Sequence, residues 1–302
     1  MKIFNIAPII CAIALLSLFT GCKKEENNQS PVVSLKTGSE YTSGGSVVLV
    51  GAPIKLGITA TASGENITNL VIKKVMPGGG VKVVLDSGMN SPGFNLNKTF
   101  YQSVEDTARW TVQVMDKNRL FATTAITIYR DPNSVWGGIF EFERLVMGYQ
   151  NNTTYGQFLV PSTGKVWTSD SATLNQTMID IVTYYFDDEG TPSPTFSSPG
   201  EEGGGIFAYY PQMQQWTSRR STKWDISVDG NPIPVTTFDA CHNDSTLIVS
   251  YNDVWGKRKF KYGEAGKVIP FITASGKKGL IKVLSADHDP DGKIEFALKI
   301  QQ

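Results

Sequence analysis

The chain has 302 residues, and its 28 Lys and Arg residues balance its 28 Asp and Glu residues, so the formal net charge at pH 7 is zero. A chain without excess positive charge lacks the electrostatic surface that nucleic-acid binding needs, so no nucleic-acid partner is expected. The sequence contains only two histidines, His242 and His288, and no Gly-x-Ser-x-Gly motif, which leaves little for histidine-dependent catalysis.

Residues 1–21 have the pattern of a secretory signal peptide. Lys2 precedes an apolar stretch from Ile3 to Phe19 that is too short for a typical membrane span. The stretch runs into Leu-Phe-Thr-Gly-Cys, which resembles the bacterial lipobox, with Phe19 where Leu is more usual. This resemblance implies that Cys22 is acylated and anchors the protein in lipid. The alternative is an ordinary signal peptide that is cleaved nearby.

Residues 22–30 are polar and predict a lipidated flexible tether. Lys24, Glu25 and Glu26 resemble the export signal of Bacteroidetes-type lipoproteins, which implies an outer-membrane, surface-exposed location. The alternative is a solvated run of charges without a sorting role.

The mature chain of about 280 residues is longer than a single hydrophobic core usually serves, so two domains are expected. Turn-forming residues and a proline at Arg130–Ser134 favour a boundary between residues 31–131 and residues 134–302. Both parts alternate apolar and polar residues over short runs, which predicts an all-β protein.

Residues 31–131 contain seven such runs, at Ser46–Val50, Ile54–Ala60, Thr68–Val75, Val81–Leu85, Phe94–Tyr101, Arg109–Met115 and Leu120–Tyr129. So many short strands in about one hundred residues predict a two-sheet sandwich. The segment Trp110–Asn118 followed by Ala122–Ile128 resembles the last hairpin of immunoglobulin-like or cadherin-like modules in bacterial surface proteins. That resemblance implies an immunoglobulin-like β-sandwich that acts as a spacer or interaction module.

Residues 134–302 predict a second antiparallel β-sandwich or jelly-roll-like domain that binds a ligand. The expected elements are a short helix at Ser171–Asp180, a buried strand at Ile179–Phe186, a Pro-, Ser- and Gly-rich loop to Gly205, and closing strands at Lys267–Ala274, Leu280–Leu284 and Lys293–Ile300. The stretch GKVIPFITASGKKGLIKV is similar to the closing strands of a group of two-domain Bacteroidetes lipoproteins, in which an immunoglobulin-like module precedes an all-β domain.

The densest group of aromatic, amide and guanidinium side chains lies between Gly203 and Arg220. Aromatic faces stack on sugar rings, and amides and guanidinium groups bind hydroxyls or carboxylates, so this segment is a candidate glycan or peptide site. The candidate ligand-binding residues are Tyr209, Tyr210, Gln214, Trp216, Arg219 and Arg220. Two alternatives remain open: these aromatics fill the β core, or the site lies elsewhere, near Trp136 or Trp167.

Two acidic segments are candidates for other chemistry. Asp287, Asp289 and Asp291 alternate before a glycine, as in the first part of an EF-hand calcium loop, but Leu298 stands where the closing glutamate is expected. A hairpin turn explains the same residues. The acids of Asp187–Glu189 follow an apolar strand and are candidate glycosidase carboxylates, with a solvated loop as the alternative.

Cys241 is the only cysteine left once the signal peptide is removed and Cys22 is lipidated, so no intramolecular disulfide is expected. If its segment forms a strand, Cys241 and His242 point to opposite faces, which favours a structural cysteine over a nucleophile.

These observations, and a resemblance to the accessory lipoproteins of Bacteroidetes polysaccharide-uptake systems, predict a surface lipoprotein that binds an extracellular glycan without cleaving it. The alternatives are an adhesive or structural envelope protein that binds another protein and, third, a glycosidase. The expected partners are outer-membrane lipid, through acylated Cys22, and an extracellular glycan or protein. Apart from the candidate calcium ion, no cofactor is expected.

Overall fold

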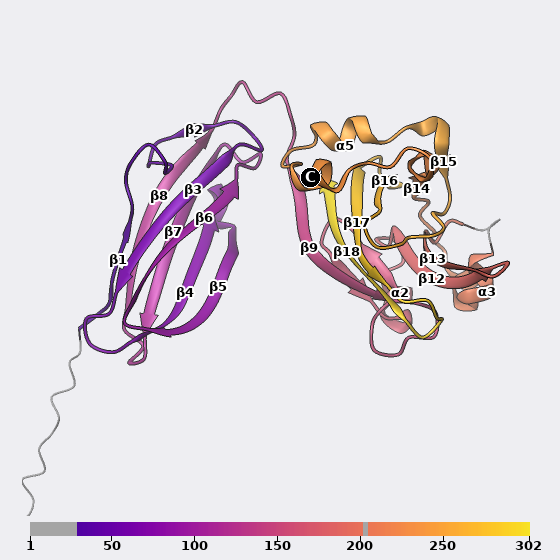
Figure 1. Cartoon of the computed structure of the whole chain (residues 1–302), viewed down its shortest axis with the longest axis horizontal. Helices are drawn as coiled ribbons and strands as arrows, with labels where there is room; N and C mark the ends of the chain where they lie inside the picture. The colour runs from indigo at the N-terminus through magenta and orange to yellow at the C-terminus, as the bar shows by residue number, and fades with distance from the viewer. Residues whose placement is uncertain (1–28, 202–204) are drawn as a thin grey trace, which may run out of the picture.

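The computed structural model describes residues 29–201 and 205–302. Figure 1 shows two β-rich domains side by side, connected by the segment that follows β8 (Phe121–Arg130). The all-β prediction is confirmed, since the longest α-helices among the described residues have only six residues. The predicted signal peptide, Cys22 and residues 22–28 of the predicted tether lie outside the described residues. In the described part of the chain, no helix combines the length and apolar character needed to cross a membrane.

The first domain is a sandwich of two sheets. One sheet has the order β1 (Val32–Leu35), β3 (Pro53–Thr61), β6 (Gly93–Tyr101). The other has the order β2 (Val47–Val48), β8 (Phe121–Arg130), β7 (Thr107–Asp116), β4 (Ile67–Val75), β5 (Val81–Ser91). All neighbours pair antiparallel except β2 and β8, which are parallel. Each of the seven predicted strands is present, and β1 is an addition.

Side-chain alternation explains why these segments form a sandwich. Along β7, Ala108, Trp110, Val112 and Val114 are buried, while the residues between them are partly or fully exposed. The buried set packs against Ile54, Leu56 and Ile58 of β3 in the facing sheet. Alternate side chains of a strand point to opposite faces, so each sheet keeps one apolar face inward.

The second domain is also a sandwich. Its larger sheet has the order β15 (Gly256–Lys257), β14 (Lys223–Asp225), β16 (Val268–Ile272), β17 (Lys278–Ala286), β18 (Lys293–Gln301), β9 (Ile139–Gly148). Its smaller sheet has the order β11 (Lys165–Trp167), β10 (Phe158–Val160), β12 (Ile181–Asp188), β13 (Thr191–Ser197). The three predicted closing strands are β16, β17 and β18.

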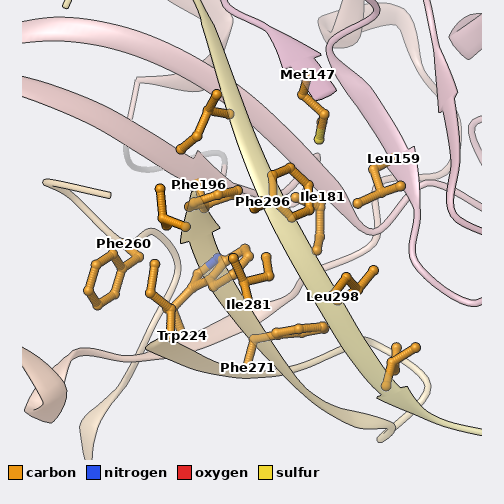
Figure 2. Close-up of a cluster of buried hydrophobic side chains, with 14 of the residues drawn as sticks. Met147, Leu159, Ile181, Phe196, Trp224, Phe260, Phe271, Ile281, Phe296 and Leu298 are labelled. Atoms are coloured by element: carbon orange, nitrogen blue, oxygen red, sulfur yellow. The ribbon is translucent and has the colours of Figure 1, made fainter. Parts of the chain in front are cut away.

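Large side chains from both sheets fill the core of this sandwich. Figure 2 shows Leu159 and Ile181 of the smaller sheet near Phe296 of the larger sheet. The Phe196 ring of β13 meets the Phe296 ring edge-on at 5.3 Å between ring centroids. Aromatic side chains bury about 150–250 Å² each, so these rings contribute a large share of the hydrophobic stabilisation of this core.

Two sequence predictions in this domain need correction. The helix predicted at Ser171–Asp180 is α2 (Ser169–Leu174), and the Asn175 side chain donates to the Ser171 carbonyl oxygen at 2.8 Å where the helix ends. The predicted Pro-rich loop is in part the buried strand β13. Its prolines are tolerated because β13 lies at the edge of its sheet, where only isolated bonds reach its outer side; at Pro194 that bond is accepted by the carbonyl oxygen, from the Gly263 N–H at 2.7 Å, so the missing proline N–H costs nothing.

Figure 1 shows the short helix α5 (Ser245–Ser250) at one end of the second domain. The other short helices described in this domain are α3 (Ile206–Tyr209), η4 (Pro211–Gln215), η5 (Ile226–Asp229), α4 (Val235–Asp239) and η6 (Asp253–Trp255), and the first domain contains η2 (Pro77–Gly79). Cys241 and His242 lie between α4 and α5, so the assumption that they occupy a strand is wrong. Cys241 is nevertheless buried, and burial raises the pKa of its thiol.

The two domains contact each other through side chains at the seam. The Tyr101 ring of the first domain stacks on the His242 imidazole at 3.3 Å between ring centroids. The Gln302 amide donates to Ser103 Oγ at 3.0 Å. Gly51 has φ +81°, and a Cβ there would lie 2.8 Å from Asn243. Stacking, hydrogen bonding and close approach therefore hold the domains in one arrangement.

Candidate functional site

The predicted aromatic segment folds into α3 and η4, and it divides into core residues and surface residues. Tyr210 and Trp216 are each 3% exposed. The Tyr210 hydroxyl donates to the Thr183 carbonyl oxygen, and the Trp216 ring lies 5.5 Å from the Phe158 ring. The Trp216 indole therefore has no open face for a sugar. Trp216 fills the core, as the alternative interpretation of this segment predicts.

The two predicted arginines stabilise the surrounding loops. Arg219 Nη1 donates to the carbonyl oxygens of Met213, Gln214 and Trp216 at 3.2, 3.2 and 2.9 Å. Arg220 Nε lies 2.7 Å from Asp180 Oδ1. Burial raises the pKa of the Asp180 carboxyl, and the hydrogen bond from Arg220 opposes that shift. Gln214 is exposed.

A cavity of about 560 Å³ opens beside this segment, and we call it the amide cleft. One wall is the loop between β9 and β10, which contributes Gln150, Asn151, Asn152, Thr153, Tyr155 and Gln157. The other wall consists of the start of α2 and the turn from α3 to η4, which contribute Thr168, Ser169, Asp170, Tyr209, Tyr210 and Gln212. Tyr209 and Tyr210 are thus the two predicted residues that line it.

Backbone hydrogen bonds to amide side chains shape the first wall. Asn152 Oδ1 accepts from the backbone N–H groups of Thr154 and Tyr155 at 2.9 and 2.8 Å. The Gln150 amide bonds the backbone N–H and carbonyl of Tyr185, at 2.8 and 2.7 Å. These bonds fix the loop before any ligand arrives, which lowers the ordering cost of binding.

Other polar groups of the cleft remain free for a ligand. No hydrogen bond among the described residues uses the side chains of Asn151, Thr153 or Asp170. Tyr155 is 38% exposed. The half-buried Tyr209 ring is held by stacking on Tyr184 at 4.2 Å between centroids. The described residues of the cleft thus offer amide, hydroxyl and aromatic groups, and Asp170 is the one charged residue among them.

A short stretch of the sequence already contains the side chains of this first wall, although the overall composition of the chain does not reveal it. Residues 149–157, YQNNTTYGQ, combine amides, hydroxyls and two tyrosines. Neither alternative tryptophan lines the amide cleft: Trp136 borders a separate cavity at the domain seam, and Trp167 lies under the Lys165 ammonium at 3.7 Å from its ring centroid.

The acidic turn before β18 packs against the cleft loop. Asn152 Nδ2 donates to the Asp291 carbonyl oxygen at 2.6 Å. Asp287 Oδ2 accepts from the Lys293 backbone N–H at 3.1 Å, and Asp289 Oδ1 accepts from the Asp291 backbone N–H at 3.0 Å. Across residues 29–201 and 205–302 no group of three His, Cys, Asp or Glu side chains is placed to hold a metal ion. The geometry favours the hairpin-turn alternative over a calcium site.

The acids of Asp187–Glu189 lie at the turn between β12 and β13. Asp187 accepts from the Gly190 backbone N–H, and Asp188 Oδ2 lies 2.8 Å from Lys261 Nζ. The hydrogen bond from Lys261 lowers the pKa of the Asp188 carboxyl, with a further contribution from the Tyr262 hydroxyl. Asp187 and Asp188 therefore stabilise the turn and hold a neighbouring segment.

No family model matches the chain, and a search of curated proteins finds no significant match.

Proposed function

We propose that this chain is a lipid-anchored surface protein whose second domain binds an extracellular glycan, without cleaving it, in the amide cleft. The single observation that carries the proposal is the lining of that cleft, where amides, hydroxyls and tyrosines surround a cavity of about 560 Å³. A neutral sugar offers hydroxyl groups that donate and accept, and apolar ring faces that stack on tyrosines. Ligand cavities typically measure about 300–1,000 Å³.

Binding of the full chain to a panel of neutral polysaccharides tests this proposal. The protein is purified in a sugar-free detergent, and both affinity and release of reducing ends are measured. Tyr155→Ala and Tyr209→Ala are expected to weaken binding about fivefold each, because one stacking contact contributes about 1 kcal/mol. Asn151→Ala removes a free amide and should weaken binding without changing the fold.

Gln214→Ala is the matched control, since Gln214 is an exposed amide of the same segment that does not line the cleft. The proposal fails if the native chain binds no neutral polysaccharide or if Gln214→Ala is as damaging as Tyr155→Ala. Release of reducing ends would contradict the non-catalytic assignment.

The anchor follows from the lipobox-like sequence before Cys22 and has its own test. Mass spectrometry of the mature N-terminal peptide should show acyl chains on Cys22, and the Cys22→Ser variant should leave the membrane fraction. An unmodified N-terminus at another residue would support the ordinary signal peptide instead.

A further inference from the structure

A second, larger cavity of about 680 Å³ lies on the second domain, and none of its residues line the amide cleft. We call it the cationic cavity, after the four basic residues in its lining. It is lined by Ile226, Lys257, Arg258, Lys259, Lys261 and Tyr262, together with two carboxylates. The segment from β15 to Tyr262 supplies five of these six residues, and η5 supplies Ile226.

The carboxylates at this cavity are already paired. Glu201 Oε1 lies 3.2 Å from Lys259 Nζ, and Glu201 is only 1% exposed. Asp229 Oδ1 lies 2.6 Å from Nζ of Lys267, a lysine that does not line the cavity. Lys261 is paired with Asp188. The acids therefore neutralise Lys259, Lys261 and Lys267.

Lys257 and Arg258 remain as excess positive charge. Both are exposed, and neither side chain has a hydrogen-bond or ion-pair partner among the described residues. Among the described residues this cavity thus gathers two cations without partners, and its lining also includes Ile226 and the Tyr262 ring. An anion that docks there gains Coulomb energy without displacing an existing ion pair.

The short edge strand at this site disfavours a peptide that pairs with the sheet. A peptide that adds to a sheet needs a run of free edge backbone, and β15, the edge strand here, is only two residues long. A uronate sugar carries a carboxylate on a ring with apolar faces, which matches cations beside an apolar surface.

We propose that the cationic cavity binds a carboxylate-bearing sugar, such as a uronate unit of an acidic polysaccharide. This adds an acidic class of glycan to the neutral class assigned to the amide cleft. The two sites share no residue, so either proposal can fail without the other.

The test compares three polymers on the full chain in sugar-free detergent: polygalacturonate, its methyl ester, and poly-L-glutamate. Polygalacturonate should bind at least about tenfold more tightly than its methyl ester, and added salt should weaken that binding. Equal binding of the ester, in the native chain and in the Tyr155→Ala variant that weakens the amide cleft, would show that charge is irrelevant, and equal binding of poly-L-glutamate would assign the cavity to acidic peptides. Either result, or no binding of polygalacturonate, overturns the proposal.

Paired substitutions locate the effect. Lys257→Glu with Arg258→Glu should reduce polygalacturonate affinity at least about tenfold, and Lys257→Gln with Arg258→Gln should reduce it less. The control is Lys82→Glu with Lys117→Glu, which makes the same charge change at exposed positions of the first domain. Unchanged affinity in both cavity variants, or an equal loss in the control, would refute the assignment. Tyr155→Ala should leave polygalacturonate binding unchanged, which separates this site from the amide cleft.

Discussion

Replacement of Trp216 by alanine separates a core role from a ligand-binding role. The Trp216 side chain packs on Phe158, and its indole N–H donates to Thr173 Oγ1 at 3.2 Å. Burial of about 200 Å² of aromatic surface at about 25 cal/mol per Å² contributes up to about 5 kcal/mol. This area figure is an upper bound and alanine retains part of the burial, so we expect Trp216→Ala to lower the free energy of unfolding by about 3–4 kcal/mol.

Urea denaturation of the native chain and the variant measures this change. Since the chain has two domains, unfolding is expected in two steps, and only the transition of the second domain should move. At low urea, where the variant remains folded, its affinity for a neutral polysaccharide should equal that of the native chain. A loss of less than about 1 kcal/mol in the free energy of unfolding, together with lost polysaccharide binding, would refute this reasoning and indicate that Trp216 contacts the ligand.

Two further predictions concern the domain seam. Burial lowers the pKa of the His242 imidazole below its ordinary value of 6.5, against the attraction of Glu141, so the unfolded chain takes up this proton first as the pH falls. Stability against urea should therefore decrease below pH 6.5, and His242→Gln should abolish this component. Gly51→Ala should cost about 1–3 kcal/mol and loosen the seam in small-angle scattering. Gly45→Ala, with a similar positive φ but open space around it, should leave the domain arrangement unchanged.

The strands were predictable where burial alternates along a single segment. Ile54–Ala60 lies within β3 and Arg109–Met115 lies within β7, because each strand places every second side chain in the core. The prediction missed β13, since prolines are usual in loops and only the edge position in a sheet makes them tolerable in a strand.

The candidate site was predictable only in part. Aromatic density identified the segment around Tyr209, but density does not show which ring points inward. Trp216 enters the core because Phe158, far away in the sequence, lies beneath it. The arginines bind carbonyl oxygens of their own loop or a buried carboxylate, which no spacing rule indicates.

The sequence by itself determined the all-β class and most of the strands of the first domain, because alternation and turn chemistry are local properties. It also predicts the Cys22 anchor, which depends on a short contiguous motif. Only the tertiary structure decided which polar groups share a cavity. The amide cleft joins residues 150–157, 168–170 and 209–212, and the cationic cavity joins η5 to the segment after β15. Such sites arise where segments distant in the chain pack together. That packing depends on contacts throughout the core, which no local stretch of sequence determines.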